Sequence, residues 1–456
     1  MRLSELVQVL SGRLLEGDAE FTGVGIDSRK DLRGQMFVAL RGARFDGHDF
    51  VAQAKAAGAS CALVERPVGC LPQLLVADTQ LGLGQLASYW RRNRFAGELV
   101  GVTGSNGKTT VKEMIAEVLG GEAQGLKTEG NLNNAIGVPL TLLRLKPEHR
   151  FAVVEMGANH IGEIGYVAAL AKPKVGVITN AGPAHLEGFG SLEGVAREKG
   201  GLIASLPADG IAVLNADDRF FQYWLGVAGA RRVISFGLTQ AAEVRAEEIA
   251  PLGFEGGRFC NRFMVCALGE RFEVELALAG RHNVVNALAA IAVGLALGRE
   301  VAEIQAGLAR MTPVAGRLRP VPAKAGAWLL DDCYNANPAS FLAGLEALRA
   351  LGGEPWVILG SFGELGQESE AFHVKAGELA REYGVCRLLA VGEESRSAVA
   401  AFGAKGQWFA SQSELIEVAQ SLLHSEARVL VKGSRKAKLE NVVAALRMAP
   451  QASPSG

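Results

Sequence analysis

The chain has 456 residues, of which 49% are hydrophobic and 21% charged, and its 47 basic and 48 acidic side chains give a net charge of −1. Its length predicts about three domains, each large enough for its own core. The charge balance excludes the excess of Lys and Arg that a general nucleic-acid or anionic-membrane binder needs, although a local basic site stays open.

The sequence shows no pattern typical of a signal peptide, a membrane span or a zinc site. Residues 1–10 carry Arg2 and Glu5 and lack a long apolar core, so they do not resemble a signal peptide. The longest apolar run, residues 287–298, has 12 residues, whereas a membrane span needs about 20. The 6 cysteines show no zinc spacing, which favours reduced thiols. We expect a cytoplasmic, soluble, multidomain enzyme that acts on small molecules.

The first part of the chain, residues 1–95, predicts a small α/β domain. Helical periodicity covers residues 81–90. Short apolar runs predict strands at residues 37–40, 61–64 and 74–76. A change in composition near residues 94–97 marks the end of this domain.

The middle part, residues 96–313, predicts a parallel sheet covered by helices on both faces. Residues 242–279 alternate in shorter stretches and predict an antiparallel patch, which a helix over residues 283–297 follows. The buried strands that alternate with helical patterns are expected at residues 99–103, 151–155, 175–179 and 211–214.

The last part, residues 314–456, predicts a doubly wound, Rossmann-like domain. Residues 312–322 hold three prolines and are interpreted as a linker, and the tail 449–456 is expected to be disordered. The expected strands are residues 328–331, 356–359, 387–391 and 429–431, and the expected helices are residues 339–350, 369–383 and 412–424.

The strongest local motif is a glycine loop, Gly101-Val-Thr-Gly-Ser-Asn-Gly-Lys108-Thr109-Thr110, between a predicted strand and a predicted helix. Backbone N–H groups of such a loop surround phosphate oxygens, and the helix N-terminus adds partial positive charge. Lys108 is placed to reach the β- and γ-phosphates, and Thr109 to bind magnesium. The general motif has its first glycine where this chain has Val102, so a chance Gly-Lys-Thr stays open as the alternative.

Two strand-end loops beside this motif carry Glu155 and His185. The carboxyl ends of parallel strands meet at the crevice where ligands bind, and magnesium prefers oxygen ligands. The alternatives are a solvated glutamate and a capping or surface histidine. Lys199 lies in a helical stretch, residues 193–203, and its residue type alone predicts a solvated side chain.

These motifs together resemble the Mur ligases, the ATP-dependent amide-forming enzymes of peptidoglycan precursor synthesis. The loop at residues 103–110 resembles that family's phosphate loop, which also lacks the first glycine. The resemblance covers essentially the whole chain. Five further motifs follow in order at residues 130–139, 155–160, 180–187, 331–338 and 431–435.

The resemblance implies three α/β domains, which bind the UDP end of a substrate (residues 1–95), bind ATP (96–313) and form a Rossmann-like domain (314–456). It implies a ligase that joins D-alanyl-D-alanine to UDP-N-acetylmuramoyl-tripeptide through an acyl phosphate, and we expect a monomer. Two alternatives stay open. One is another Mur-type or folylpolyglutamate-type amide ligase, and the other is a nucleotide-binding regulator without catalysis.

The resemblance also implies residue roles at the nucleotide. ATP would be bound by Gly104, Ser105, Asn106, Gly107, Lys108, Thr109, Thr110, Asn283, Arg317, Asp332, Tyr334 and Asn335. Thr109, Glu155, His185 and Lys199 would hold two magnesium ions, with Lys199 carbamylated into an anionic oxygen ligand. Lys108, Lys199 and His185 would be catalytic.

For the substrates, the resemblance points to two regions. In the N-terminal domain it points to Ser28, Arg29, Arg41, Asp46 and His48, for which ordinary turn chemistry is the alternative. Asn133, Asn134 and Asn159 would contact substrate from the central domain. One stretch departs from the family pattern, because Ser361-Phe362 stands where the family usually has Asp-Met.

Overall fold

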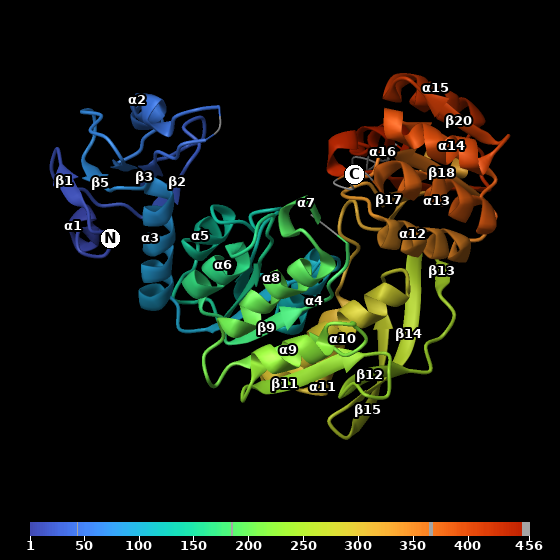
Figure 1. Cartoon of the computed structure of the whole chain (residues 1–456), viewed down its shortest axis with the longest axis horizontal. Coiled ribbons are helices and arrows are strands. Elements are labelled where there is room, and N and C mark those ends of the chain that lie inside the picture. Colours follow the sequence, from blue (N-terminus) through green and yellow to red (C-terminus); the bar gives the residue numbers. More distant parts are fainter. Residues whose placement is uncertain (43, 184–185, 364–367, 449–456) are drawn as a thin grey trace, which may run out of the picture.

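The computed structural model describes residues 1–42, 44–183, 186–363 and 368–448, and these fold into three α/β domains, each built around its own sheet (Figure 1). The N- and C-terminal domains lie on opposite sides of the central domain (Figure 1). The predicted α/β class with three domains is therefore confirmed. The predicted disordered tail, residues 449–456, lies outside the described residues.

The N-terminal domain is a five-stranded sheet in the order β1-β5-β4-β3-β2, parallel except for β1. Its strands are β1 (Arg13–Leu15), β2 (Gly23–Gly25), β3 (Gln35–Val38), β4 (Cys61–Val64) and β5 (Gln73–Leu75). Its helices are α1 (Leu3–Leu6), the 3₁₀ helix η1 (Gly47–Phe50), α2 (Val51–Ala56) and α3 (Thr79–Arg94). Asp78 caps α3 by accepting the Leu81 N–H at 2.9 Å, and α3 leads into the central domain.

The central domain holds a ten-stranded sheet in the order β13-β14-β12-β11-β10-β9-β6-β8-β7, with β15 paired to β14. Its strands are β6 (Glu98–Thr103), β7 (Gly125–Lys127), β8 (Phe151–Glu155), β9 (Val175–Ile178), β10 (Ile211–Asn215), β11 (Arg232–Gly237), β12 (Val244–Glu247), β13 (Gly253–Glu255), β14 (Arg258–Ala267) and β15 (Glu270–Leu276). Its helices are α4 (Lys108–Val118), α5 (Gly137–Leu142), α6 (Glu163–Ala171), α7 (Leu186–Phe189), α8 (Leu192–Ala204), α9 (Phe221–Ala228), α10 (Arg281–Ala296) and α11 (Val301–Ala309). Strands β6 to β12 are parallel neighbours and β12 to β15 pair antiparallel, as the sequence predicts.

The C-terminal domain is a six-stranded sheet in the order β16-β17-β21-β18-β19-β20, parallel except for β16. Its strands are β16 (Arg319–Pro322), β17 (Trp328–Asp332), β18 (Glu354–Gly360), β19 (Arg387–Val391), β20 (Gly406–Phe409) and β21 (Ala427–Lys432). Its helices are α12 (Pro338–Ala350), α13 (Ser369–Glu382), α14 (Arg396–Phe402), α15 (Gln412–Leu422) and α16 (Glu440–Leu446), with short 3₁₀ helices η2 (Lys324–Gly326), η4 (Glu393–Ser395) and η5 (Arg435–Ala437).

Buried strand residues alternate between the two faces of these sheets. In β18, Val357 and Leu359 belong to one core cluster, while Trp356 and Ile358 belong to the cluster on the other face. A strand of period two buries both faces only when helices cover both, which explains the near-continuous apolar runs in the sequence.

The structure corrects the expectation of a linker over residues 312–322. Residues 319–322, within the predicted linker, form edge strand β16, because an edge strand tolerates the prolines that a central strand excludes. The central and C-terminal domains share an aromatic contact, since the Phe254 ring of β13 lies 5.2 Å from the Trp328 ring of β17.

Two further expectations concern cysteine pairing and membrane-spanning helices. All six cysteines, each within the described ranges, are unpaired. No helix in the described part of the chain is long and apolar enough to cross a membrane.

Candidate active site

The phosphate loop joins the end of β6 to the start of α4, and its conformation requires glycine at two positions. Gly107 has φ +81°, and a Cβ there would lie 2.5 Å from Asn286 Oδ1. A Cβ on Gly104 would lie 1.8 Å from Thr179 Oγ1. The backbone therefore passes close to the neighbouring strand end, with the N-terminus of α4 facing the loop.

The loop after β9 holds the phosphate loop in place. Ser105 N–H donates to the Asn180 carbonyl at 3.0 Å, and Asn106 N–H donates to Asn180 Oδ1 at 2.9 Å. Thr179 Oγ1 donates to the Asn106 carbonyl at 2.6 Å. These contacts join the loops that follow β6 and β9, which are parallel neighbours in the sheet.

Glu155, at the end of β8, is buried and faces the first turn of α4. Its side chain accepts hydrogen bonds from Thr109 Oγ1 at 3.0 Å and from Asn133 Nδ2 at 2.9 Å. Lys112 Nζ, also buried, lies 3.8 Å from the same carboxylate and donates to the Thr128 carbonyl at 2.7 Å. Glu155 is only 3% exposed, so the alternative of a solvated glutamate is wrong.

This pair of oxygen donors fits magnesium. Magnesium is commonly bound by one or two carboxylates together with substrate phosphates, and Glu155 and Thr109 supply a carboxylate and a hydroxyl beside the phosphate loop. Within the described residues no group of three or more His, Cys, Asp or Glu side chains forms a metal cage. His185 lies outside the described residues.

Two lysines face the same region. Lys108 is half-buried, and its Nζ donates to the Gly104 carbonyl at 2.7 Å and to the Ser105 carbonyl at 3.3 Å. Burial lowers the pKa of Lys108, and Glu155 opposes that shift. Lys199, on α8, is 6% exposed, so the expectation of a solvated lysine is wrong.

Burial and, to a lesser degree, the Lys108 charge lower the pKa of Lys199 to about 7, while Glu198 opposes the shift. Among the described residues the Lys199 side chain makes no hydrogen bond or ion pair. An amine with this environment is available as a neutral nucleophile near neutral pH.

The C-terminal domain adds a cation and an aromatic ring to this region. Arg317 Nη2 donates to Thr109 Oγ1 at 2.9 Å, and its guanidinium lies 4.5 Å from the Tyr334 ring centre. Asp332 is paired with the buried Lys432 at 2.5 Å. Lys432 Nζ also donates to the Asn335 carbonyl at 3.1 Å, which ties the end of β17 to β21.

A cavity of about 640 Å³ lies between these two domains. It brings together most of the predicted residues of both domains, as follows: Gly104, Ser105, Asn106, Gly107, Lys108, Thr109, Asn133, Asn134, Glu155, Asn159, Lys199, Arg317, Asp332, Tyr334 and Asn335. Such convergence of a phosphate loop, a carboxylate and cations is the arrangement that a phosphoryl-transfer site requires.

Some predicted residues have other local roles. Asn283 is buried and donates to the Ala279 carbonyl at 2.7 Å, and Thr110 is buried within α4. Asn134 Oδ1 accepts from Gly137 N–H at 2.8 Å and so caps α5. Asn159 is exposed at the cavity.

Phe362 belongs to the Ser361-Phe362 stretch that departs from the family pattern. It is buried and stacks on His373, with 4.9 Å between the ring centres.

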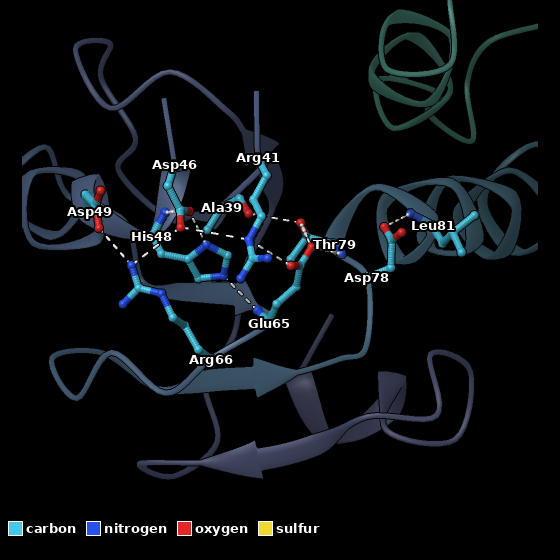
Figure 2. A network of polar contacts seen from close by, with 10 residues as sticks. All are labelled: Ala39, Arg41, Asp46, His48, Asp49, Glu65, Arg66, Asp78, Thr79 and Leu81. Atoms are coloured by element: carbon cyan, nitrogen blue, oxygen red, sulfur yellow. Dashed lines mark hydrogen bonds and ion pairs between the residues drawn. The ribbon is translucent and has the colours of Figure 1, made fainter. Parts of the chain in front are cut away.

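Three of the predicted N-terminal residues, Arg41, Asp46 and His48, belong to a polar network next to α3 (Figure 2). Fully buried His48 holds Asp46 through Nδ1 at 2.5 Å and accepts the Glu65 N–H on Nε2 at 2.8 Å. Hydrogen bonds from the His48 backbone and side chain lower the pKa of Asp46 to about 2. Arg41 lies 3.1 Å from Glu65, which also accepts from Thr79 Oγ1 at 3.0 Å (Figure 2).

This network places Arg41 outside the central cavity but beside one of its edges. Thr79 is the first residue of α3, and the next residue, Gln80, lines the cavity. Arg29 pairs with Asp27 at 2.8 Å on the surface, and Ser28 Oγ donates to Gln53 at 3.1 Å. The pairing of Arg29 with Asp27 fits the alternative of ordinary turn chemistry. Arg41, in contrast, lies near two carboxylates, those of Asp46 and Glu65.

Four residues of these clusters receive no role from the sequence alone, namely Glu65, Lys112, Asn337 and Lys432. Glu65 and Lys112 lie outside the motifs, whereas Asn337 and Lys432 lie within those at residues 331–338 and 431–435. Each is recognised only through its partner in space, such as Asp332 for Lys432, 100 residues away along the chain.

Comparison with known families gives three matches along the chain. Residues 20–80 match the model of the Mur ligase family catalytic domain, residues 102–294 the Mur ligase middle domain, and residues 316–435 the Mur ligase glutamate ligase domain.

Individual proteins are similar over nearly the full length. The UDP-N-acetylmuramoyl-tripeptide–D-alanyl-D-alanine ligase of Escherichia coli strain K12 is 44% identical over 448 residues, 98% of each chain. A crystal structure of MurF from Acinetobacter baumannii has a TM-score of 0.88 and 36% identity, covering 97% of each chain. MurF ligase from Thermotoga maritima in complex with ADP has a TM-score of 0.82 and 30% identity, covering 93% of this chain and 96% of that chain.

Proposed function

This chain belongs to the Mur ligase family, and we propose that it is the member that joins D-alanyl-D-alanine to UDP-N-acetylmuramoyl-tripeptide at the expense of ATP. The product is the UDP-muramoyl-pentapeptide precursor of peptidoglycan. The observation that carries this proposal is the shared cavity, in which Lys108, Glu155 and Lys199 of the central domain face Arg317 and Tyr334 of the C-terminal domain.

The chemistry needs two steps because a carboxylate is a poor acylating group. The terminal carboxylate of the tripeptide attacks the γ-phosphorus of ATP, the bond from that phosphorus to the β–γ bridging oxygen breaks, and ADP leaves. The amine of D-alanyl-D-alanine then attacks the acyl carbon. The bond from the acyl carbon to the bridging oxygen breaks, and phosphate leaves with that oxygen. The amine then loses a proton, and the amide remains.

The residues of the phosphate loop bind and orient ATP in this scheme. The loop amides and the α4 N-terminus face the phosphates, and Lys108 turns from its two carbonyl partners toward the transferred phosphoryl group. Arg317 meets the same charge from the C-terminal domain. Preorganised cations of this kind stabilise charge that develops in the transition state.

Thr109, Glu155 and His185 are the residues that we assign to magnesium, with Lys199 as a carbamate. Bound magnesium supplies charge neutralisation on the phosphate oxygens. Lys199 reaches the carbamate by attack of its neutral amine on carbon dioxide, with release of one proton. Its burial beside Lys108, without an anionic partner among the described residues, favours that neutral amine.

The N-terminal network is assigned to the UDP end of the substrate. Arg41 supplies a guanidinium suited to a diphosphate, and Asp46 and His48 fix the loop that carries it. We keep residues 1–95, 96–313 and 314–456 as the proposed domains, and the protein as a proposed monomer. Ser28, Asn133, Asn134 and Asn159 stay as proposed substrate contacts.

An amine panel tests this function. ADP release is measured with UDP-muramoyl-tripeptide and either D-alanyl-D-alanine or a single amino acid, and separately with a folate and glutamate. Turnover that requires the dipeptide supports the proposal, whereas turnover with glutamate on a folate substrate would favour the folylpolyglutamate-type alternative. Nucleotide binding without turnover for any pair would favour a regulator.

A further inference from the structure

Asn337, the residue before α12, uses both ends of its side-chain amide. Its Oδ1 accepts the Ser340 N–H at 2.9 Å, which caps the helix, and its Nδ2 donates to Asn106 Oδ1 at 2.7 Å. The cap fixes which end of the amide faces the helix, because only oxygen accepts from an N–H group. The NH₂ end is therefore directed at the phosphate loop of the other domain.

All but one of the other polar groups of Asn106 make hydrogen bonds within the protein. Its N–H donates to Asn180 Oδ1, and its carbonyl accepts from Thr179 Oγ1 and Asn180 Nδ2. With Oδ1 bound to Asn337, the remaining group is Nδ2, which donates to no described residue. Gly182 leaves space beside it, since a Cβ there would lie 3.8 Å from Nδ2.

We propose that Asn337 is a positioning residue that fixes the amide orientation of Asn106, so that Asn106 Nδ2 donates to a phosphate oxygen of the bound nucleotide. The proposal rests on the proposed function for its ligand, a nucleoside polyphosphate at the phosphate loop. Without Asn337 the Asn106 amide turns freely, and half of its orientations present an oxygen to an anion.

The effect on binding follows from the value of one hydrogen bond. A net contribution of about 0.5–1.5 kcal/mol corresponds to roughly a 2- to 12-fold change in the dissociation constant. Asn337 also lines the cavity, but its side-chain amide is used by Ser340 and Asn106, so in this proposal it acts on the nucleotide through Asn106. Its removal should therefore have no effect once Asn106 is absent.

Calorimetric titration of the full chain with Mg·ADP tests the coupling. Asn337→Ser keeps a helix cap but loses the donor; because half of the freed Asn106 orientations still donate, it should weaken ADP binding about 2-fold. Asn106→Ala removes the donor itself and should weaken binding about 2- to 12-fold, and the double variant should be no weaker than Asn106→Ala alone. Ser411→Ala removes the cap of α15, away from the cavity, and should leave ADP binding unchanged.

Asn337→Asp gives a second measurement when it is made alone and in the Asn106→Ala background, where the added charge remains but no amide is left to turn. The part of the loss that is caused by the Asn106 amide should disappear in that background. Aspartate caps α12 at least as well as asparagine, yet its carboxylate draws Asn106 Nδ2 toward itself and turns Oδ1 to the phosphates. ADP binding should then be weaker than in Asn337→Ser, although thermal stability is no lower. Equal binding in the two variants would overturn the proposal.

Two further outcomes separate this inference from the function on which it rests. If Lys108→Ala weakens ADP binding but Asn337→Ser does not, or if the effects of Asn337→Ser and Asn106→Ala multiply, Asn337 has no positioning role. If Lys108→Ala leaves ADP binding unchanged, the nucleotide site itself is wrongly assigned.

Discussion

Replacing Lys199 by methionine should stabilise the folded protein near pH 7 while it abolishes ligation. Methionine has a similar length and no charge, so it removes the cost of holding an ammonium group at a site that is 6% exposed. It also removes the amine that we assign to a carbamate. If the substitution raises the free energy of unfolding and stops turnover, the lysine contributes to catalysis at a cost in stability.

The size of the effect follows from the pKa of Lys199, which burial lowers from 10.5 to about 7. At about 1.4 kcal/mol per pH unit, that difference corresponds to an upper bound of roughly 4–5 kcal/mol. The unfolded chain binds the extra proton between pH 7 and 10.5, so wild-type stability rises with pH through that window. The advantage of Lys199→Met should be full below pH 7 and fade toward pH 10.5.

Thermal unfolding in carbonate-free buffers from pH 6 to about pH 10 measures this difference. Lys146→Met, at a side chain that is 64% exposed, is the matched control and should change stability by less than about 0.5 kcal/mol. Added bicarbonate near pH 8 should stabilise the wild type but not Lys199→Met. A stability difference that does not vary with pH would refute the reasoning.

Three other predictions concern the remaining parts of the site. Lys108→Ala should lower turnover at least about 10²-fold in a folded protein, and near-normal kinetics would remove Lys108 from the phosphoryl site. Glu155→Gln should retain metal-free ADP binding but lose the increment that magnesium adds, measured by titration with and without the ion; an unchanged increment would contradict the ligand assignment. Arg41→Ala should raise KM for the UDP substrate about 10-fold or more with KM for ATP unchanged, and the reverse pattern would place Arg41 elsewhere.

The regular elements follow from hydrophobic patterning where strands are buried on both faces. β19 has the bounds that its apolar run predicts, residues 387–391. β16 and β20 do not stand out, because they are edge strands that carry proline or polar residues and need pair on one side only. Their existence depends on pairing with β17 and β19, which hydrophobic patterning within each short strand does not reveal.

The residues of the candidate site also fall into two groups, those that a local motif predicts and those that depend on contacts distant in sequence. The glycine loop, Glu155 and the 331–338 motif are local patterns, so the sequence alone points to them. Lys199 is different, because residue type predicts a solvated lysine and only the packing of α8 buries it. Glu65 and Asn337 act through partners from other elements, and a contact such as Asn337 to Asn106 spans 231 residues of chain.

The most direct measurement of the central claim is a ligation with UDP-muramoyl-tripeptide whose terminal carboxylate carries oxygen-18. With both carboxylate oxygens labelled, and with ATP, magnesium and D-alanyl-D-alanine present, we expect UDP-muramoyl-pentapeptide, one ADP per amide, and one labelled oxygen in each released phosphate. Label that stays wholly in the peptide, or amide formation without ADP, would contradict an acyl-phosphate ligase.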